Sequence, residues 1–132
     1  MIKAQQDERK RVLIVDDDPN IVELVKDTLG HAQYDVVGAY SGFEALQTLQ
    51  TQKVDMLVVD LMLSTNMDGY ELCKQVKKNK ETERIPILIL SAKSQMDDKL
   101  NAVYAGADDY MPKPFLPEEL AKRVRLNLNL HF

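Results

Sequence analysis

Short runs of aliphatic residues recur along this chain and constrain its fold more than any other feature. The runs VLIV (12–15), VDMLVV (54–59) and IPILIL (85–90) are apolar without alternation, which is typical of strands buried on both faces of a parallel sheet. YDVVGAY (34–40) and the weaker DDYMP (108–112) complete five predicted strands. Amphipathic stretches separate the strands, so we predict a doubly wound α/β fold of (βα)5 order, with helices on both faces of the sheet.

Helix start and stop signals support this order. Gly30 follows the first apolar stripe, where it predicts a left-handed helix cap. Ser41 with Glu44 and Asp68 with Glu71 have the spacing of capping boxes. A last helix is expected to begin at Pro117. The residues expected on the apolar faces of the four clearest helices are Ile21, Leu24, Val25, Leu29, Phe43, Leu46, Leu49, Leu72, Val76, Leu120, Val124 and Leu128.

Composition excludes several classes of protein. The 132 residues fit one domain, and no apolar run approaches the ~18–20 residues of a membrane span or follows the pattern of a secretory signal. Cys73 is the only cysteine, so an internal disulfide or a thiolate zinc site is excluded and a reducing, cytoplasmic location is expected. A net charge of −4 gives no electrostatic footprint for nucleic acid.

Polar side chains follow four of the predicted strands at the point where each strand ends. Asp16 and Asp17 follow the first strand, Asp60 the third, Ser91 the fourth and Lys113 the fifth. Taken singly, each acid could be a helix cap. The carboxyl ends of parallel strands meet at one edge of the sheet, however, and ligands bind there.

Three carboxylates around one point need a cation. Oxygen ligands favour a hard ion, so Mg²⁺ is expected, with Mn²⁺ as the alternative. Asp60 beside such an ion could attack a phosphoryl group in line. The ion, the Ser91 hydroxyl and the Lys113 ammonium would then stabilise its three equatorial oxygens. Asp18, which precedes Pro19, is expected to cap a helix instead.

The motifs VLIVDDDP, LVVD followed by MDG, LSA, and KPF occur in this order at strand ends between about residues 11 and 128. Together they resemble the receiver domain of response regulators in two-component signalling. The resemblance implies a flavodoxin-like, three-layer sandwich with strand order 2-1-3-4-5. It also implies that Asp60 is the phosphoacceptor, which receives its phosphoryl group from the phosphohistidine of a sensor kinase or phosphotransfer protein.

The resemblance assigns further roles. Asp17 would bind Mg²⁺ directly, Asp16 largely through water, and Met62 through its backbone carbonyl. Lys113 would be followed by a cis bond to Pro114. Tyr110 would be an aromatic switch that turns inward when Ser91 moves toward the phosphoryl group, changing the face of the fourth helix, fifth strand and fifth helix. The alternative is that Tyr110 is simply an aromatic residue of an edge strand.

The chain departs from the family pattern in one loop. DLMLSTNMDG has Ser64 at the place of a proline and one additional residue, which predicts a longer and less rigid loop. Met62 precedes the insertion, so the metal site should survive. Met62 and Lys93 occupy positions that tune water access in relatives, and slow loss of the phosphoryl group is expected.

Three other functions compete with a phosphorylation switch. A phosphatase of the haloacid-dehalogenase type would need a second aspartate where Met62 stands, and a nucleotide-binding domain would need a glycine-rich motif that the chain lacks. A binding module that keeps the fold without phosphorylation stays open. We expect no separate enzymatic turnover of a substrate.

The predicted organisation is a disordered lead-in over residues 1–10 and a receiver domain over 11–129, with no output domain. The chain would then be a single-domain regulator or a fragment of a longer one. The expected partners are a kinase or phosphotransfer protein and a downstream effector, without direct contact to nucleic acid or membrane. Dimerisation on phosphorylation is left open.

Overall fold

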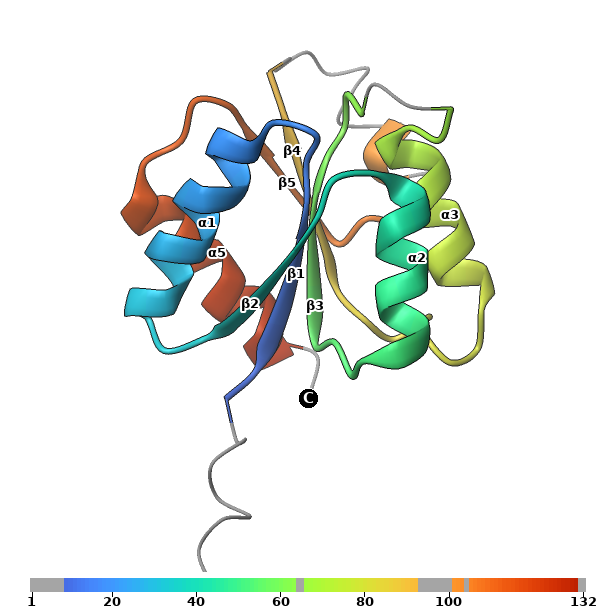
Figure 1. Ribbon diagram of the computed structural model, residues 1–132, viewed down its shortest axis with the longest axis horizontal. Coiled ribbons are helices and arrows are strands. Elements are labelled where there is room, and N and C mark those ends of the chain that lie inside the picture. Colours follow the sequence, from blue (N-terminus) through green and yellow to red (C-terminus); the bar gives the residue numbers. More distant parts are fainter. Residues whose placement is uncertain (1–8, 64–65, 93–100, 104, 131–132) are drawn as a thin grey trace, which may run out of the picture.

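The computed structural model describes residues 9–63, 66–92, 101–103 and 105–130 (Figure 1). Five parallel strands form one sheet in the order β2-β1-β3-β4-β5, which confirms the predicted fold and strand order. Residues 101–103 add a helical turn. The elements are β1 (Arg11–Val15), α1 (Pro19–His31), β2 (Asp35–Ala39), α2 (Gly42–Thr51), β3 (Met56–Asp60), α3 (Gly69–Lys78), β4 (Ile87–Ser91), β5 (Asp109–Pro112) and α5 (Pro117–Leu130).

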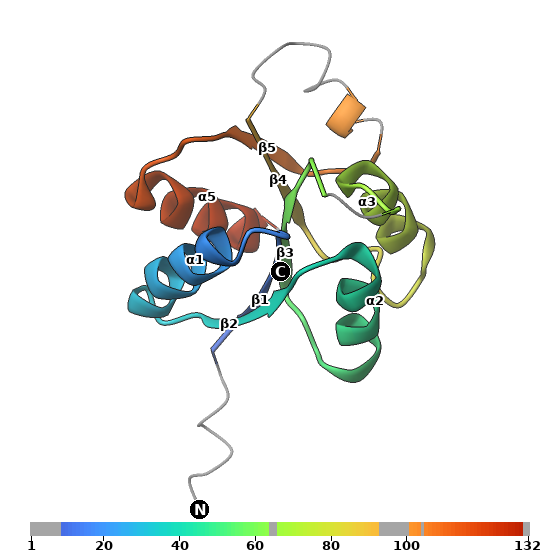
Figure 2. The same ribbon diagram turned by 45° about the horizontal axis from the view of Figure 1, so that its top comes forward.

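The sheet lies between two helical layers. Helices α1 and α5 cover one face, and α2 and α3 cover the other (Figures 1 and 2). Alternate residues of each central strand therefore enter different apolar clusters: in β1, Val12 and Ile14 pack with α1 and α5, whereas Leu13 and Val15 pack on the opposite face. This two-sided burial explains why the strands are apolar without alternation.

The first helix ends later than its glycine predicts. Gly30 lies inside α1, which continues to His31, and the left-handed residue is Gln33 with φ 71°. The Gln33 N–H donates to the Gly30 carbonyl at 3.0 Å, and the Tyr34 N–H donates to the Leu29 carbonyl at 3.0 Å. These two hydrogen bonds form a Schellman motif, so the prediction that Gly30 is the cap is wrong.

Helix N-termini follow the sequence signals closely. The Asp18 side chain accepts from the Asn20 N–H at 2.9 Å and caps α1. Ser41 caps α2 by accepting from the Glu44 N–H at 3.1 Å, and Asp68 caps α3 in the same way. The Glu44 carboxylate reaches back one residue beyond the cap, where it accepts a hydrogen bond from the Tyr40 N–H.

Two residues predicted to lie in the core are exposed. Phe43 is 57% exposed and Leu24 is 39% exposed. The inward faces of their helices include Val22 in α1 and Gly42 and Ala45 in α2, which lie one or two positions along the chain from Leu24 and Phe43. The other predicted core residues are buried (Val25, Leu29, Leu72, Val76, Leu120 and Val124) or half-buried (Ile21, Leu46, Leu49 and Leu128).

No helix in the described ranges has the length and apolarity that crossing a membrane would require.

Candidate functional site

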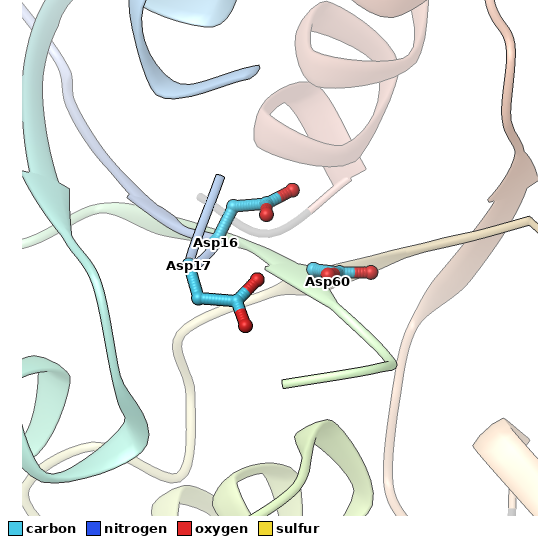
Figure 3. A group of neighbouring side chains, drawn as sticks. All are labelled: Asp16, Asp17 and Asp60. Carbon is cyan, nitrogen blue, oxygen red and sulfur yellow. The ribbon is translucent and has the colours of Figure 1, made fainter. Parts of the chain in front are cut away.

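Three carboxylates converge at the carboxyl edge of the sheet. Asp16 and Asp17 directly follow β1, and Asp60 is the last residue of the adjacent strand β3 (Figure 3). One oxygen from each side chain lies within 4.8 Å of the others. Asp16 is fully buried, Asp60 is 5% exposed and Asp17 is half-buried. The strand order thus brings together the three acids that the sequence singled out.

Lys113 provides a positive charge in this group. Its Nζ donates to Asp16 Oδ2 at 3.0 Å and lies 3.4 Å from Asp60 Oδ1. Two backbone groups add to the compensation: the Asp18 N–H donates to Asp16 Oδ1 at 2.9 Å, and the Met62 N–H donates to Asp60 Oδ1 at 3.2 Å. The Asp60 carboxylate is therefore held in place by a backbone hydrogen bond and by the Lys113 ammonium.

The ionisation of the site reflects its burial. Burial raises the pKa of Asp16, against the effect of its hydrogen bonds to the Asp18 N–H and to Lys113, and the neighbouring Asp60 charge raises it further. Burial acts to lower the pKa of Lys113, but the Asp16 hydrogen bond and the charges of both acids outweigh it, so that pKa is also raised. Lys113 is held as a cation, whereas the charge on Asp16 is costly.

This imbalance fits a bound cation. Three carboxylates lie together, two of them are almost completely buried, and the Lys113 ammonium contacts those two. The donor set consists of oxygens alone, and such a set is suited to Mg²⁺ or Mn²⁺ rather than to a softer metal. Asp16, Asp17 and Asp60 are the residues that would hold the ion.

Backbone hydrogen bonds fix the ends of the strands that carry these side chains. The Asp16 N–H donates to the Ala39 carbonyl at 3.1 Å, and the Leu61 N–H donates to the Leu90 carbonyl at 2.9 Å. The Lys113 N–H donates to the Ser91 carbonyl at 2.6 Å. The pairing between strands thus continues past their last residues, so the site is built on rigid elements.

Ser91 and Tyr110 lie on the same face of the sheet. Ser91 is the buried last residue of β4, and it follows Leu90, which pairs with Asp60. Tyr110 pairs with Ile89, two positions before Ser91, and side chains two apart along a strand share a face. Tyr110 is 8% exposed and belongs to the apolar cluster on the α2 and α3 side. Its ring is thus directed inward in this structure.

One feature implied by the resemblance is confirmed, and others stay predictions. The Lys113–Pro114 bond is cis, as the resemblance implied. The Met62 N–H faces Asp60, whereas the role of its carbonyl as a metal ligand is untested. Ser64, Lys93 and most of the predicted lead-in lie outside the described residues.

Sequence reasoning missed two features of the site. The contact of Lys113 with Asp16 joins residues 97 positions apart, and no local pattern signals it. The close packing of Gly69 against the Asp60 backbone was also missed, although the MDG motif contains this glycine.

Comparison with known proteins identifies the family that combines this fold with this acidic site. Residues 12–125 match the response regulator receiver domain family, and the chain belongs to it. It is thus a receiver domain of two-component signalling.

Particular relatives share much of the sequence. The chain is 45% identical over 116 residues to the alkaline phosphatase synthesis transcriptional regulatory protein PhoP of Bacillus subtilis, and 41% identical over 115 residues to the DNA-binding dual master transcriptional regulator RpaA of Synechocystis. The matches cover 88% and 87% of this chain but 47% of each relative, so the chain spans about half of their length.

The solved structures agree with this assignment. A putative response regulator from Chloroflexus aurantiacus superposes with a TM-score of 0.88 at 41% identity, covering 92% of this chain and 99% of that one. The family assignment and the fold are therefore supported independently.

Proposed function

We propose that this protein is a phosphorylation-dependent signalling switch, in which Asp60 accepts a phosphoryl group from the phosphohistidine of a sensor kinase or phosphotransfer protein. One observation carries the proposal: Asp60 ends a central strand, almost buried, with two further carboxylates on one side and the Lys113 ammonium 3.4 Å away. A buried acid with a purely structural role could be compensated by the Lys113 ammonium alone. The additional cluster of carboxylates, with the geometry of a metal site, therefore points to a functional role.

The reaction is an in-line displacement. An Asp60 carboxylate oxygen forms a bond to phosphorus, the P–N bond of the phosphohistidine breaks, and its electron pair stays on the imidazole nitrogen. A bound Mg²⁺ would neutralise charge on the transferring group and orient one of its oxygens. Lys113 already contacts Asp60 and so lies within reach of a second oxygen. Ser91 is proposed to donate its hydroxyl to the third.

The switch is proposed to act through β5. Ser91 and Tyr110 share one face of the sheet on the neighbouring strands β4 and β5, and Ser91 lies two residues beyond Ile89, the residue that pairs with Tyr110. Movement of the Ser91 hydroxyl toward the phosphoryl group would change the packing around Tyr110 and, with it, the surface formed by β5, α5 and the preceding helical region. Phosphorylation would act by stabilising one of two packings.

The proposed partners are a sensor kinase or phosphotransfer protein and an effector protein or domain. PhoP and RpaA are named as transcriptional regulators and are about twice as long as this chain, which supports an effector as the recipient of the signal. We propose that this receiver has no separate substrate turnover, that it acts in the cytoplasm, and that it contacts nucleic acid only through such an effector.

Intact mass measurement after incubation with a small phosphoramidate or acyl phosphate tests the proposal. The protein should gain one phosphoryl group with Mg²⁺ and none without it, and Asp60→Asn should abolish the gain. Asp27→Asn is the matched control, because Asp27 is an exposed acid on α1, and it should be phosphorylated like the wild type. A folded wild-type protein that gains no mass under any condition would favour a phosphorylation-independent binding module of the same fold.

A further inference from the structure

The loop between β3 and α3 is closed at both ends in spite of its additional residue. The Leu61 N–H donates to the Leu90 carbonyl at 2.9 Å, which holds the start of the loop to β4. The Gly69 N–H donates to the Leu61 carbonyl at 3.1 Å, which brings the first residue of α3 back to the end of β3. Leu61 and Gly69, at the two ends of the loop, are thus joined to each other.

The closure requires a glycine. A Cβ atom at Gly69 would lie 2.7 Å from the Asp60 carbonyl oxygen and 2.8 Å from Leu61 Cα. Both neighbours are backbone atoms of the strand end, so neither can rotate away as a flexible side chain could. Gly69 has a helical backbone without positive φ, so the requirement is for space rather than for an unusual conformation.

A second contact holds the same end of the loop. Met67 is 5% exposed and packs against the start of α2, where a Cβ atom at Gly42 would lie 2.6 Å from Met67 Sδ. The end of the loop is therefore fixed from two directions, by Met67 in the apolar cluster and by Gly69 against the acceptor backbone.

We propose that Gly69 is a positioning residue for phosphoryl transfer to Asp60, because its lack of a side chain lets α3 press the loop closed against the acceptor backbone. The inference rests on the proposed phosphorylation of Asp60. Any group added at residue 69 must push α3 away or displace Asp60, whose Oδ1 is shared between the Met62 N–H and Lys113. A displacement of Asp60 would move both a proposed ligand of the metal and the oxygen that attacks phosphorus.

Gly69→Ala tests the proposal, with Gly30→Ala as its matched control. Gly30 is also helical, but a Cβ atom there would meet nothing within 4 Å. The comparison is between the double variant Gly30→Ala/Gly69→Ala and the single variant Gly30→Ala, which is expected to be more stable than the wild type. The measurements are Mg²⁺ affinity by titration calorimetry without a phosphoryl donor, and the phosphorylation rate as a function of acyl phosphate concentration at saturating Mg²⁺.

The double variant should lose ~10–100-fold in maximal rate and should bind Mg²⁺ more weakly, as expected when a supporting contact of a metal site is removed. The donor concentration that gives half the maximal rate should change little. A merely structural glycine would lower the folded fraction without changing the rate or the Mg²⁺ affinity per folded molecule, and that result would overturn the proposal.

Two controls separate the ways in which the test can fail. If the Gly30→Ala parent is not phosphorylated, the proposed function itself fails. If the double variant does not fold, Met67→Ala decides, since it releases the same end of the loop without a clash: a loss of maximal rate supports the positioning role, and an unchanged rate refutes it.

Discussion

Replacing Lys113 by methionine should destabilise the metal-free protein strongly, because this ammonium compensates two almost buried carboxylates. The Lys113 side chain is 20% exposed, and those of Asp16 and Asp60 are 1% and 7% exposed. Breaking a buried ion pair by removing one partner costs ~3–5 kcal/mol. The partial exposure of Lys113 favours the lower end, so we expect a loss of about 3 kcal/mol at pH 7, equivalent to a decrease in Tm of ~12 °C.

Added Mg²⁺ should reduce this loss. A divalent cation among the three carboxylates replaces the missing positive charge, so the difference in unfolding free energy between wild type and Lys113→Met should fall by at least about half at saturating Mg²⁺. Urea denaturation at equilibrium, with EDTA and then with Mg²⁺, measures both differences.

Lys77→Met is the matched control. Lys77 is 22% exposed, pairs with Asp108 at 3.2 Å and donates to the Ile85 carbonyl at 2.8 Å, at a place outside the acidic cluster. This variant should also be destabilised, but Mg²⁺ should not reduce the loss. The reasoning is refuted if Lys113→Met costs less than about 1 kcal/mol without metal, since a broken buried pair costs more, or if Mg²⁺ leaves its deficit unchanged.

The pH dependence provides an independent check. The raised pKa of Lys113 means that its stabilisation is present below the ordinary lysine pKa and is lost as pH rises through the raised value. The pKa of Asp16 is raised as well, so its charge lowers stability at neutral pH, and the cost is relieved as pH falls through that pKa. Without Lys113 the pKa of Asp16 should rise further, so the deficit of Lys113→Met should shrink as pH is lowered.

Three further predictions concern stability and reactivity. Gly30→Ala should stabilise the protein by up to ~1 kcal/mol in urea denaturation, because the site is helical and open; a loss of stability would contradict the assignment of Gly30 to the helix interior. Gln33→Gly should stabilise by about 1 kcal/mol, since φ is 71° there, and an unchanged midpoint would argue against the Schellman cap. Burial raises the pKa of the Cys73 thiol to about 12, so a disulfide reagent at pH 8 should label it only after unfolding. Because the unfolded thiol ionises first, stability should decrease as pH rises above about 8.5, and rapid labelling of the native protein would refute the burial.

The fold was predictable because its signals are local. Uninterrupted apolar runs indicate strands covered on both faces, and Ser41, Asp68 and Asp18 stand where a side-chain oxygen can cap a helix. Gly30 and Phe43 were misjudged at helix ends, where a short apolar stripe leaves the inward face uncertain by one position.

By itself, the sequence determined the strands, their parallel arrangement and the set of polar residues at the strand ends. It did so because burial and helix capping act over a few neighbouring residues. Only the tertiary structure decided that Lys113 pairs with Asp16 as well as Asp60, and that α3 approaches so closely that residue 69 has room for no side chain. These contacts join residues far apart in the chain, and their distances depend on how neighbouring strands and helices pack.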